Sequence, residues 1–437
     1  MLTRVFLLQK IAKALLGATL HFSSRTPRGK GRFLLPLLLG LSILTLLSVV
    51  IGSLCAFFLN SLQWVTTYRL SHPRALFFLP GAGLLLGLLY HYYGRACERG
   101  NNLILEQIHQ PGGGLPKRMT PLILFATLLT HLFGGSVGRE GTAIQMGGSI
   151  ASTLATCLKL PPEPTKLLLL SGVAAGFGAV FGTPLAGALF ALEVLQARLF
   201  FRLDDFPILL IVSIVATLSA RAWGIHHFIY QFSTSIDHPF LSPSLLLKAA
   251  LLGLGVAIIL RIFIATEHLL HLGFEKTLPY PPLRPLVGGF SILALVALLG
   301  TQSYLGLGEY SSSDASLLTI ESFFQSTSIS PWTWWWKLLF TALTLGSGFK
   351  GGEVTPLFFM GAAFGNTLGG ILGVPADLFA ALGLVAIFAG ATKTPFTSLI
   401  MSLELFGVKL LLPMIVASFC SYFLSGQRSI FPSQRRH

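Results

Sequence analysis

The sequence predicts an all-α, polytopic membrane protein, and three observations support this fold class. Hydrophobic residues make up 53% of the 437 residues, charged residues make up 11%, and the mean hydropathy is +0.74. Such a composition leaves too little polar surface to solvate a soluble globule of this length, so the bilayer is the expected solvent. Two apolar runs, 33–65 and 246–270, each exceed the ~20 residues that a helix needs to cross the hydrocarbon core.

Shorter apolar segments interrupted by glycine, proline or an isolated charge are the third observation. Simple membrane-spanning hairpins lack such interruptions. Broken helices are tolerated inside a bilayer only where their loose ends line a cavity within the protein, and they are typical of transporter folds. The segments are 121–133, 142–158, 167–180, 184–194, 356–372, 378–389 and 395–406.

The net charge of +14 is explained better by membrane topology than by nucleic-acid binding. Basic residues lie mainly at the chain ends and between apolar runs, and they form no face with interleaved aromatic residues. Segment 1–32 carries seven lysines and arginines and no acidic residue, which predicts a cytoplasmic N-terminus. Arg428, Arg435 and Arg436 predict a cytoplasmic C-terminus as well. We expect a multi-pass protein of a bacterial inner (cytoplasmic) membrane, without a cleaved signal peptide.

The four cysteines have no spacing typical of a metal site and lie in or beside apolar stretches. Small packing residues are therefore the expected role. No disulfide, metal ion or cofactor is expected. The cysteines are Cys55, Cys97, Cys157 and Cys420.

An internal repeat divides the chain into two halves. Gly138-Arg139-Glu140-Gly141-Thr142 resembles Gly351-Gly352-Glu353-Val354-Thr355, and about forty residues downstream of each the segment 183–193 resembles 394–404. The order of both elements is kept. Homologous halves of a membrane protein usually bind substrate at their interface near the bilayer midplane. The repeat alone is compatible with parallel or inverted halves.

Glycine-rich segments, 134–138 and 346–352, lead directly into a predicted helix start in each half. Most other glycines at four-residue spacing are explained by close helix packing. Flexible backbone before a helix presents free N–H groups and the positive end of the helix dipole, which together can bind an anion without a cation.

Carboxylates within apolar surroundings are the candidate functional groups, because an ionisable group inside a membrane is costly. Glu140 and Glu353 are the strongest, since each lies at a glycine-fed helix start and can compete with an anion for the same N–H groups. An ordinary acidic residue stabilised by a helix dipole is the alternative for both. Glu193 and Glu404 occupy matching places in the repeat, which favours a structural role, and Glu106 is compatible with a rim position.

Three motifs resemble signatures of the CLC family of anion channels and antiporters. They are Gly138-Arg139-Glu140-Gly141, the segment 172–179, and Thr183-Pro184-Leu185-Ala186-Gly187. The resemblance implies a CLC fold of about eighteen broken, tilted helices in two inverted repeats, with an anion pathway in each subunit of a homodimer. The implied organisation is a transport domain at 33–437, with repeats at about 33–225 and 243–425, a tail at 426–437 and no regulatory cytoplasmic domain.

The resemblance also implies roles for individual residues. Glu140 corresponds to the gating glutamate of the family, and backbone N–H groups near it and near Glu353 would face the anion. Asn101 falls where chloride-type members have a central serine, and Phe431 falls where they have a pore-lining tyrosine. The expected anion-binding residues are Asn101, Gly141, Thr142, Val354 and Phe431.

Departures from the chloride-type motifs are similar to the fluoride-specific branch of the family. Thr142 replaces a proline, Glu353 introduces a carboxylate, and Val194 stands where chloride/proton antiporters have an internal proton-transfer glutamate. Fluoride is a strong hydrogen-bond acceptor, which suits a donor such as the Asn101 amide. We expect export of fluoride in exchange for protons, with a CLC chloride/proton antiporter or chloride channel as the alternative. Common enzyme motifs are missing, so an enzyme is not expected.

Overall fold

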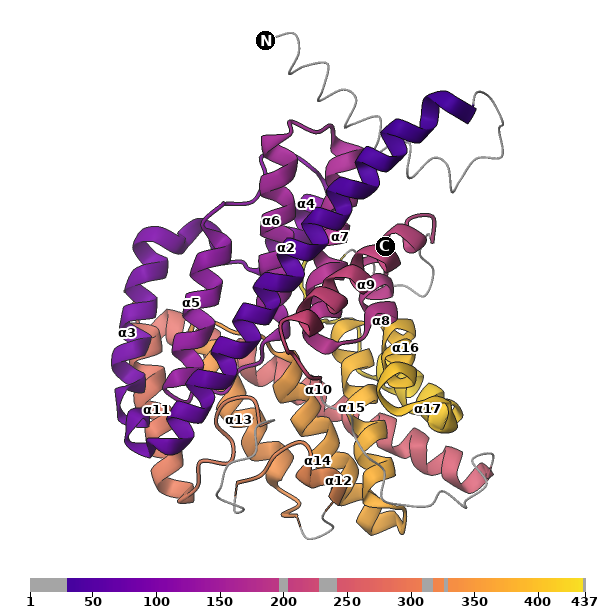
Figure 1. The fold of residues 1–437 in the computed structure, drawn as a ribbon. Helices are drawn as coiled ribbons and strands as arrows, with labels where there is room; N and C mark the ends of the chain where they lie inside the picture. Colours follow the sequence, from indigo (N-terminus) through magenta and orange to yellow (C-terminus); the bar gives the residue numbers. More distant parts are fainter. Residues whose placement is uncertain (1–29, 196–202, 228–241, 309–316, 326–328, 435–437) are drawn as a thin grey trace.

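The computed structural model describes residues 30–195, 203–227, 242–308, 317–325 and 329–434 (Figure 1). Within these ranges the chain forms sixteen α-helices joined by loops and short 3₁₀ or π turns, without a β-strand. Most of the basic N-terminal segment, together with Arg435 and Arg436, lies outside the described residues. The predicted all-α fold is confirmed.

The helices differ widely in length, from 4 residues in α12 to 42 residues in α2. The first half contains α2 (Lys30–Ser71), α3 (Leu79–Leu89), α4 (Asn101–His109), α5 (Met119–Leu132), α6 (Glu140–Cys157), α7 (Pro162–Phe181), α8 (Pro184–Glu193) and α9 (Phe206–Ala222). The second half contains α10 (Pro243–Thr277), α11 (Leu283–Leu299), α12 (Ser322–Gln325), α13 (Thr333–Gly346), α14 (Val354–Leu372), α15 (Ala376–Thr392), α16 (Pro395–Phe406) and α17 (Leu411–Leu424).

Proline and glycine set the ends of several short helices. Pro184 and Pro395 occupy the first turns of α8 and α16, where a missing N–H leaves no helical hydrogen bond unmade. Gly182 and Gly373 end α7 and α14 in the left-handed conformation, with φ of 74° and 64°. Such local signals explain why the chain is divided into segments shorter than a membrane span.

Among the described residues, five helical segments are long and apolar enough to cross a membrane, and one of them, 73–109, is made of α3, α4 and short turns. In their most apolar windows, α2 and α10 are 44% buried, whereas α7 is 89% buried. The long helices therefore leave much of their surface for lipid, and α7 lies inside the protein. The segments are 38–71, 73–109, 162–181, 243–277 and 354–372.

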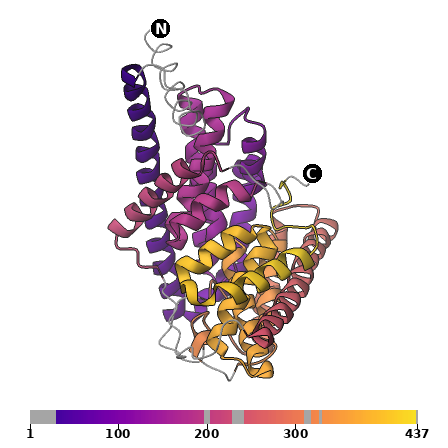
Figure 2. The same ribbon diagram turned by 90° about the vertical axis from the view of Figure 1, so that its right-hand side faces the viewer.

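Most helices of each half lie together in one block, although α11 of the second half packs beside α3 of the first (Figures 1 and 2). Equivalent helices have equivalent neighbours. In the first block α6 packs on α7, and α9 packs on α2 and α7; in the second, α14 packs on α15, and α17 packs on α10 and α15. The repeat seen in the sequence is therefore also a repeat of packing.

Helices α8 and α16 join the two blocks and cap each other. The carboxylate of Glu193, at the end of α8, accepts hydrogen bonds from Phe396 N (3.0 Å) and Thr397 N (2.6 Å) at the start of α16. The carboxylate of Glu404, on α16, accepts them from Leu185 N (3.0 Å) and from the next backbone N–H of α8 (2.9 Å). These contacts require the two equivalent helices to run in opposite directions, as inverted repeats do. They also give both glutamates a structural contact, at a helix start in the other half.

Candidate functional site

The glycine-fed loops of the two halves meet in a short antiparallel bridge. Gly138 N donates to Gly352 O (2.5 Å), and Gly352 N donates to Gly138 O (2.7 Å). A Cβ on Gly352 would lie 3.0 Å from Gly141 N, and one on Gly138 would lie 2.8 Å from a carboxylate oxygen of Glu140. Glycine at both positions allows this close approach without a shift of the neighbouring atoms, and the starts of α6 and α14 lie side by side.

The carboxylate of Glu140 lies between these two helix starts and is 1% exposed. Its Oε2 accepts hydrogen bonds from Arg139 N (3.1 Å) and from Thr355 N (3.2 Å), which belongs to the first turn of α14. Its Oε1 accepts a hydrogen bond from the Thr355 hydroxyl. The Arg139 guanidinium lies 3.9 Å from the same oxygen. A first-half carboxylate thus occupies the anion-binding end of a second-half helix.

This position makes Glu140 a competitor for any anion that binds there. Charged, it satisfies backbone N–H groups that have no partner within a helix and benefits from the dipole of α14. Protonated, it loses most of that attraction, so an anion can take its place. Proton binding and anion binding at this junction are therefore linked by simple competition.

Asn101 lies next to the junction, at the first residue of α4. A Cβ on Gly141 would lie 2.9 Å from the Asn101 amide nitrogen and 3.3 Å from the Cα of Gly352. Gly100, with φ of 52°, occupies the N-cap position of α4, and no side-chain capping bond is made there. Asn101 therefore does not cap α4. Its buried amide oxygen has no hydrogen-bond partner among the described residues.

Gly141, Thr142 and Val354 belong to the first turns of α6 and α14 and are all buried. The Thr142 hydroxyl forms a 2.7 Å hydrogen bond with the Thr127 hydroxyl on α5. Either hydroxyl can be the donor in this bond, so Thr142 can offer an anion its backbone N–H group and, where Thr127 donates, its hydroxyl as well. Gly141 and Val354 have no polar side chain and can offer only their backbone N–H groups.

Glu353 occupies the N-cap position of α14 and lines a cavity of about 270 Å³. Further residues lining this cavity come from α10 and from the segment after α17, and include Glu267, His268 and Arg428. The sequence repeat leads one to expect both glutamates to face a single central anion. Instead, Glu140 faces the helix junction, and Glu353, one residue beyond Gly352, is a wall of this separate cavity.

Phe431 lies after α17, is 5% exposed, and contacts an aromatic cluster. Its ring centroid is 6.3 Å from that of Phe190 on α8, which is in turn 4.5 Å from Phe177 and 6.2 Å from Phe388. Sequence reasoning places Phe431 in the pore lining. In the structure its ring contacts Phe190 on α8, and this contact neither supports nor excludes a place in the pore lining.

Comparison with known proteins is consistent with this geometry. Residues 82–426 match the voltage-gated chloride channel family. The chain belongs to the CLC family. A chloride/fluoride channel protein of Pseudomonas syringae pv. tomato is 40% identical over 397 residues, covering 90% of this chain and 86% of that protein. A proton/chloride exchange transporter of Vibrio parahaemolyticus is 27% identical, covering 70% of this chain and 69% of the relative.

Solved CLC structures share the fold. A CLC-type fluoride/proton antiporter has a TM-score of 0.83 and 33% identity, covering 91% of this chain and 98% of that chain. A slow cyanobacterial chloride/proton antiporter has a TM-score of 0.70 and 20% identity, over 90% and 96% of the respective chains. The CLC fold expected from the motifs is therefore confirmed, and the chain is a multi-pass membrane protein of this family.

In this CLC protein, three buried basic side chains gather around Gly306. Arg69 on α2, His131 on α5 and Lys337 on α13 are each at most 4% exposed. Lys337 Nζ donates to the carbonyl oxygen of Gly306 (2.7 Å), and a Cβ on that glycine would lie 3.5 Å from Arg69 Nη2 and 3.9 Å from His131 Nδ1.

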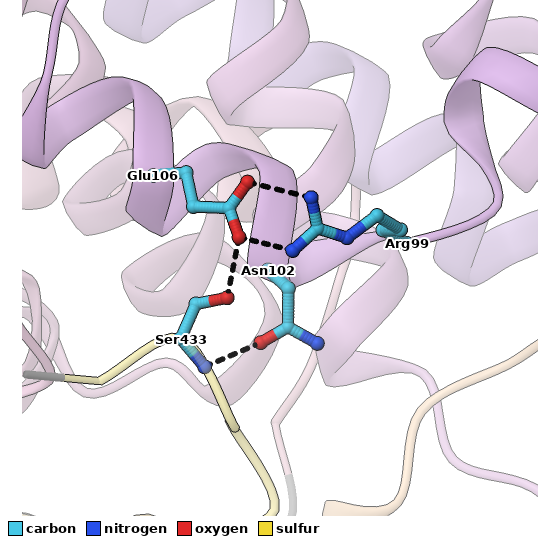
Figure 3. A network of polar contacts seen from close by, with 4 residues as sticks. All are labelled: Arg99, Asn102, Glu106 and Ser433. Atoms are coloured by element: carbon cyan, nitrogen blue, oxygen red, sulfur yellow. Dashed lines mark hydrogen bonds and ion pairs between the residues drawn. The ribbon is translucent and has the colours of Figure 1, made fainter.

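The segment after α17 is anchored to α4 through Asn102 and Glu106 (Figure 3). Ser433 N donates to the side-chain oxygen of Asn102 (3.0 Å), and the Ser433 hydroxyl donates to Glu106 (2.9 Å). Arg99 forms a bidentate ion pair with Glu106, and Arg99 Nη1 lies 2.8 Å from Glu106 Oε2. Glu106, for which a rim position is expected, thus binds Ser433 and helps to hold the end of the described chain against α4.

Sequence reasoning missed two features of the site. Thr355 holds the Glu140 carboxylate through both its backbone and its hydroxyl, and Glu267 shares the cavity of Glu353. The repeat offered a signal for the first, because Thr355 is the counterpart of Thr142. The second comes from α10, which is far from both motifs in the sequence.

Proposed function

We propose that this CLC protein is a secondary active transporter that exports fluoride in exchange for protons. The observation that carries the proposal is the Glu140 carboxylate, which occupies the start of α14 through Thr355. A site that holds either a carboxylate or an anion can exchange the two when the carboxylate is protonated. Relatives described as a chloride/fluoride channel protein and as a fluoride/proton antiporter support fluoride as the anion.

The residues proposed to carry the exchange fall into two groups. Glu140 is the gate, and Glu353 is a second proton-binding carboxylate, present where chloride-type motifs have an apolar residue. Backbone N–H groups of the first turns of α6 and α14 bind the anion, with the Asn101 amide as a further donor. Phe431 lines the path near α8. The proposed anion-binding set is Asn101, Gly141, Thr142, Val354 and Phe431.

The proposed setting is a bacterial inner membrane, with both termini in the cytoplasm and two subunits per homodimer. The charge pattern of the N-terminal segment supports the orientation. The proposed transport domain spans 33–437, with repeats at about 33–225 and 243–425. No catalytic conversion of a substrate is part of this function.

Liposomes loaded with fluoride test the proposal. Outward movement of fluoride and inward movement of a proton both carry positive charge inward, so the membrane potential must be clamped at zero with potassium and an ionophore. For one-for-one exchange, lowering the external pH by one unit then supplies about 1.4 kcal/mol. This free energy can drive fluoride outward until its external concentration is about tenfold higher than its internal concentration. A fluoride electrode should record uphill efflux after external acidification. Fluoride movement that ignores the pH gradient would indicate a channel, and equal movement of chloride would favour the chloride-type alternative.

A further inference from the structure

The inner half of the proton route lacks the internal proton-transfer glutamate of chloride/proton antiporters, because Val194 stands at that position. Another group must therefore carry the proton there. Val194 cannot carry a proton and is 2% exposed at the end of α8. The neighbouring Glu193 accepts two backbone hydrogen bonds and one from the Thr397 hydroxyl (2.6 Å), all at the start of α16. Neither residue lines the cavity of Glu353. A proton that reaches Glu353 must therefore leave by another path.

The cavity beside Glu353 provides such a path. Its volume of about 270 Å³ has room for several water molecules, at about 30 Å³ each. One wall is α10, one is the start of α14, and one is the segment after α17, whose end the charge pattern places in the cytoplasm. The lining residues on α10 are Phe263, Ile264, Glu267 and His268, and those after α17 are Arg428, Ser429, Ile430 and Pro432.

Ionisable side chains follow one another from the protein surface into this cavity. His268 is exposed, and Glu267 and Glu353 are partly buried. Arg428 adds a positive charge that offsets the two carboxylates. On the next turn of α10, the His271 ring lies 3.6 Å from Glu275. The backbone of Glu267 packs against Gly346, the last residue of α13. Gly346 has no side chain and therefore adds no charge near Glu267.

We propose that this cavity is a proton-release vestibule, in which Glu267 and His268 pass protons between Glu353 and the cytoplasmic water. The proposal rests on the proposed fluoride/proton exchange. During fluoride export, protonated Glu353 gives its proton through cavity water to the Glu267 carboxylate, and His268 or bulk water takes it from there. Each step breaks one O–H bond and forms one O–H or N–H bond, so every group returns to its starting state.

The test compares Glu267→Gln/His268→Gln with wild type in fluoride-loaded liposomes, with fluoride efflux and proton uptake recorded at several internal pH values. We expect proton-coupled flux at least about tenfold slower than wild type, with a flattened dependence on internal pH. The single variant Glu267→Asp should keep most of the wild-type rate of proton-coupled flux, because aspartate keeps the carboxylate. Glu275→Gln is the matched control: it makes the same change on α10, and Glu275 does not line the cavity.

The outcomes separate this proposal from the exchange function. If wild type shows no proton coupling, the exchange function fails, and the vestibule fails with it. If wild type is coupled and Glu353→Gln is not, but the double variant keeps the wild-type rate and pH dependence, only the vestibule is overturned. Should the double variant not fold, Glu267→Gln alone decides by the same criteria.

Discussion

Replacing Thr355 by valine tests whether Glu140 and the anion compete for the start of α14. The Thr355 hydroxyl donates to Oε1 of Glu140, and the Thr355 backbone N–H donates to Oε2 at 3.2 Å. Valine keeps the side-chain shape and the backbone donor but removes the hydroxyl. A hydrogen bond to a charged group contributes about 1.5–3 kcal/mol. Because the gate loses this contact and the backbone donors remain for fluoride, apparent fluoride affinity should rise by about 10- to 150-fold.

Calorimetric titration of the purified protein with fluoride measures this affinity, and the fluoride dependence of efflux provides a second reading. Thr127→Val is the control, since it makes the same substitution at a buried threonine whose hydroxyl bonds to Thr142 and not to Glu140. The control should bind fluoride as wild type does. Unchanged or weaker fluoride binding in Thr355→Val, with the control intact, would refute the competition between carboxylate and anion.

Three further substitutions test separate parts of the account. Asn101→Ser should lower the fluoride-to-chloride ratio of efflux, and an unchanged ratio would remove the Asn101 amide from the anion site. Val194→Ala should leave proton coupling substantially intact, because valine cannot carry a proton; loss of coupling in a folded protein would contradict this. Glu193→Gln should destabilise the protein more than Glu404→Gln, by about 1 kcal/mol, since Glu193 accepts one additional hydrogen bond. Equal melting temperatures of the two variants would argue against that ranking.

Much of the fold could be predicted because its signals are local. Composition indicates the bilayer, and proline and glycine at the ends of α7, α8, α14 and α16 divide the apolar segments into short helices. The repeated motifs also place Glu140 and Glu353 at helix starts, and the structure has Glu140 as the first residue of α6 and Glu353 as the N-cap of α14.

The partners of these residues could not be predicted, because they depend on contacts between segments far apart in the chain. Glu140 binds Thr355, 215 positions away, and Glu193 binds Thr397, 204 positions away. The periodicity of a helix does not indicate which other helix start it will meet. The cavity of Glu353 likewise forms only when α10 and the segment after α17 come together.

The central claim is that Glu353 binds a proton during each transport cycle. Glu353→Gln tests it most directly, since glutamine keeps the size and hydrogen-bonding capacity of the side chain but cannot ionise. Fluoride efflux and proton uptake should be recorded together in voltage-clamped liposomes, beside wild type and Glu140→Gln. The account predicts that proton-driven fluoride efflux is lost or strongly slowed in Glu353→Gln, and that proton coupling is lost in Glu140→Gln. Wild-type rates with wild-type coupling in Glu353→Gln would contradict the account and leave Glu353 with a structural role at the start of α14.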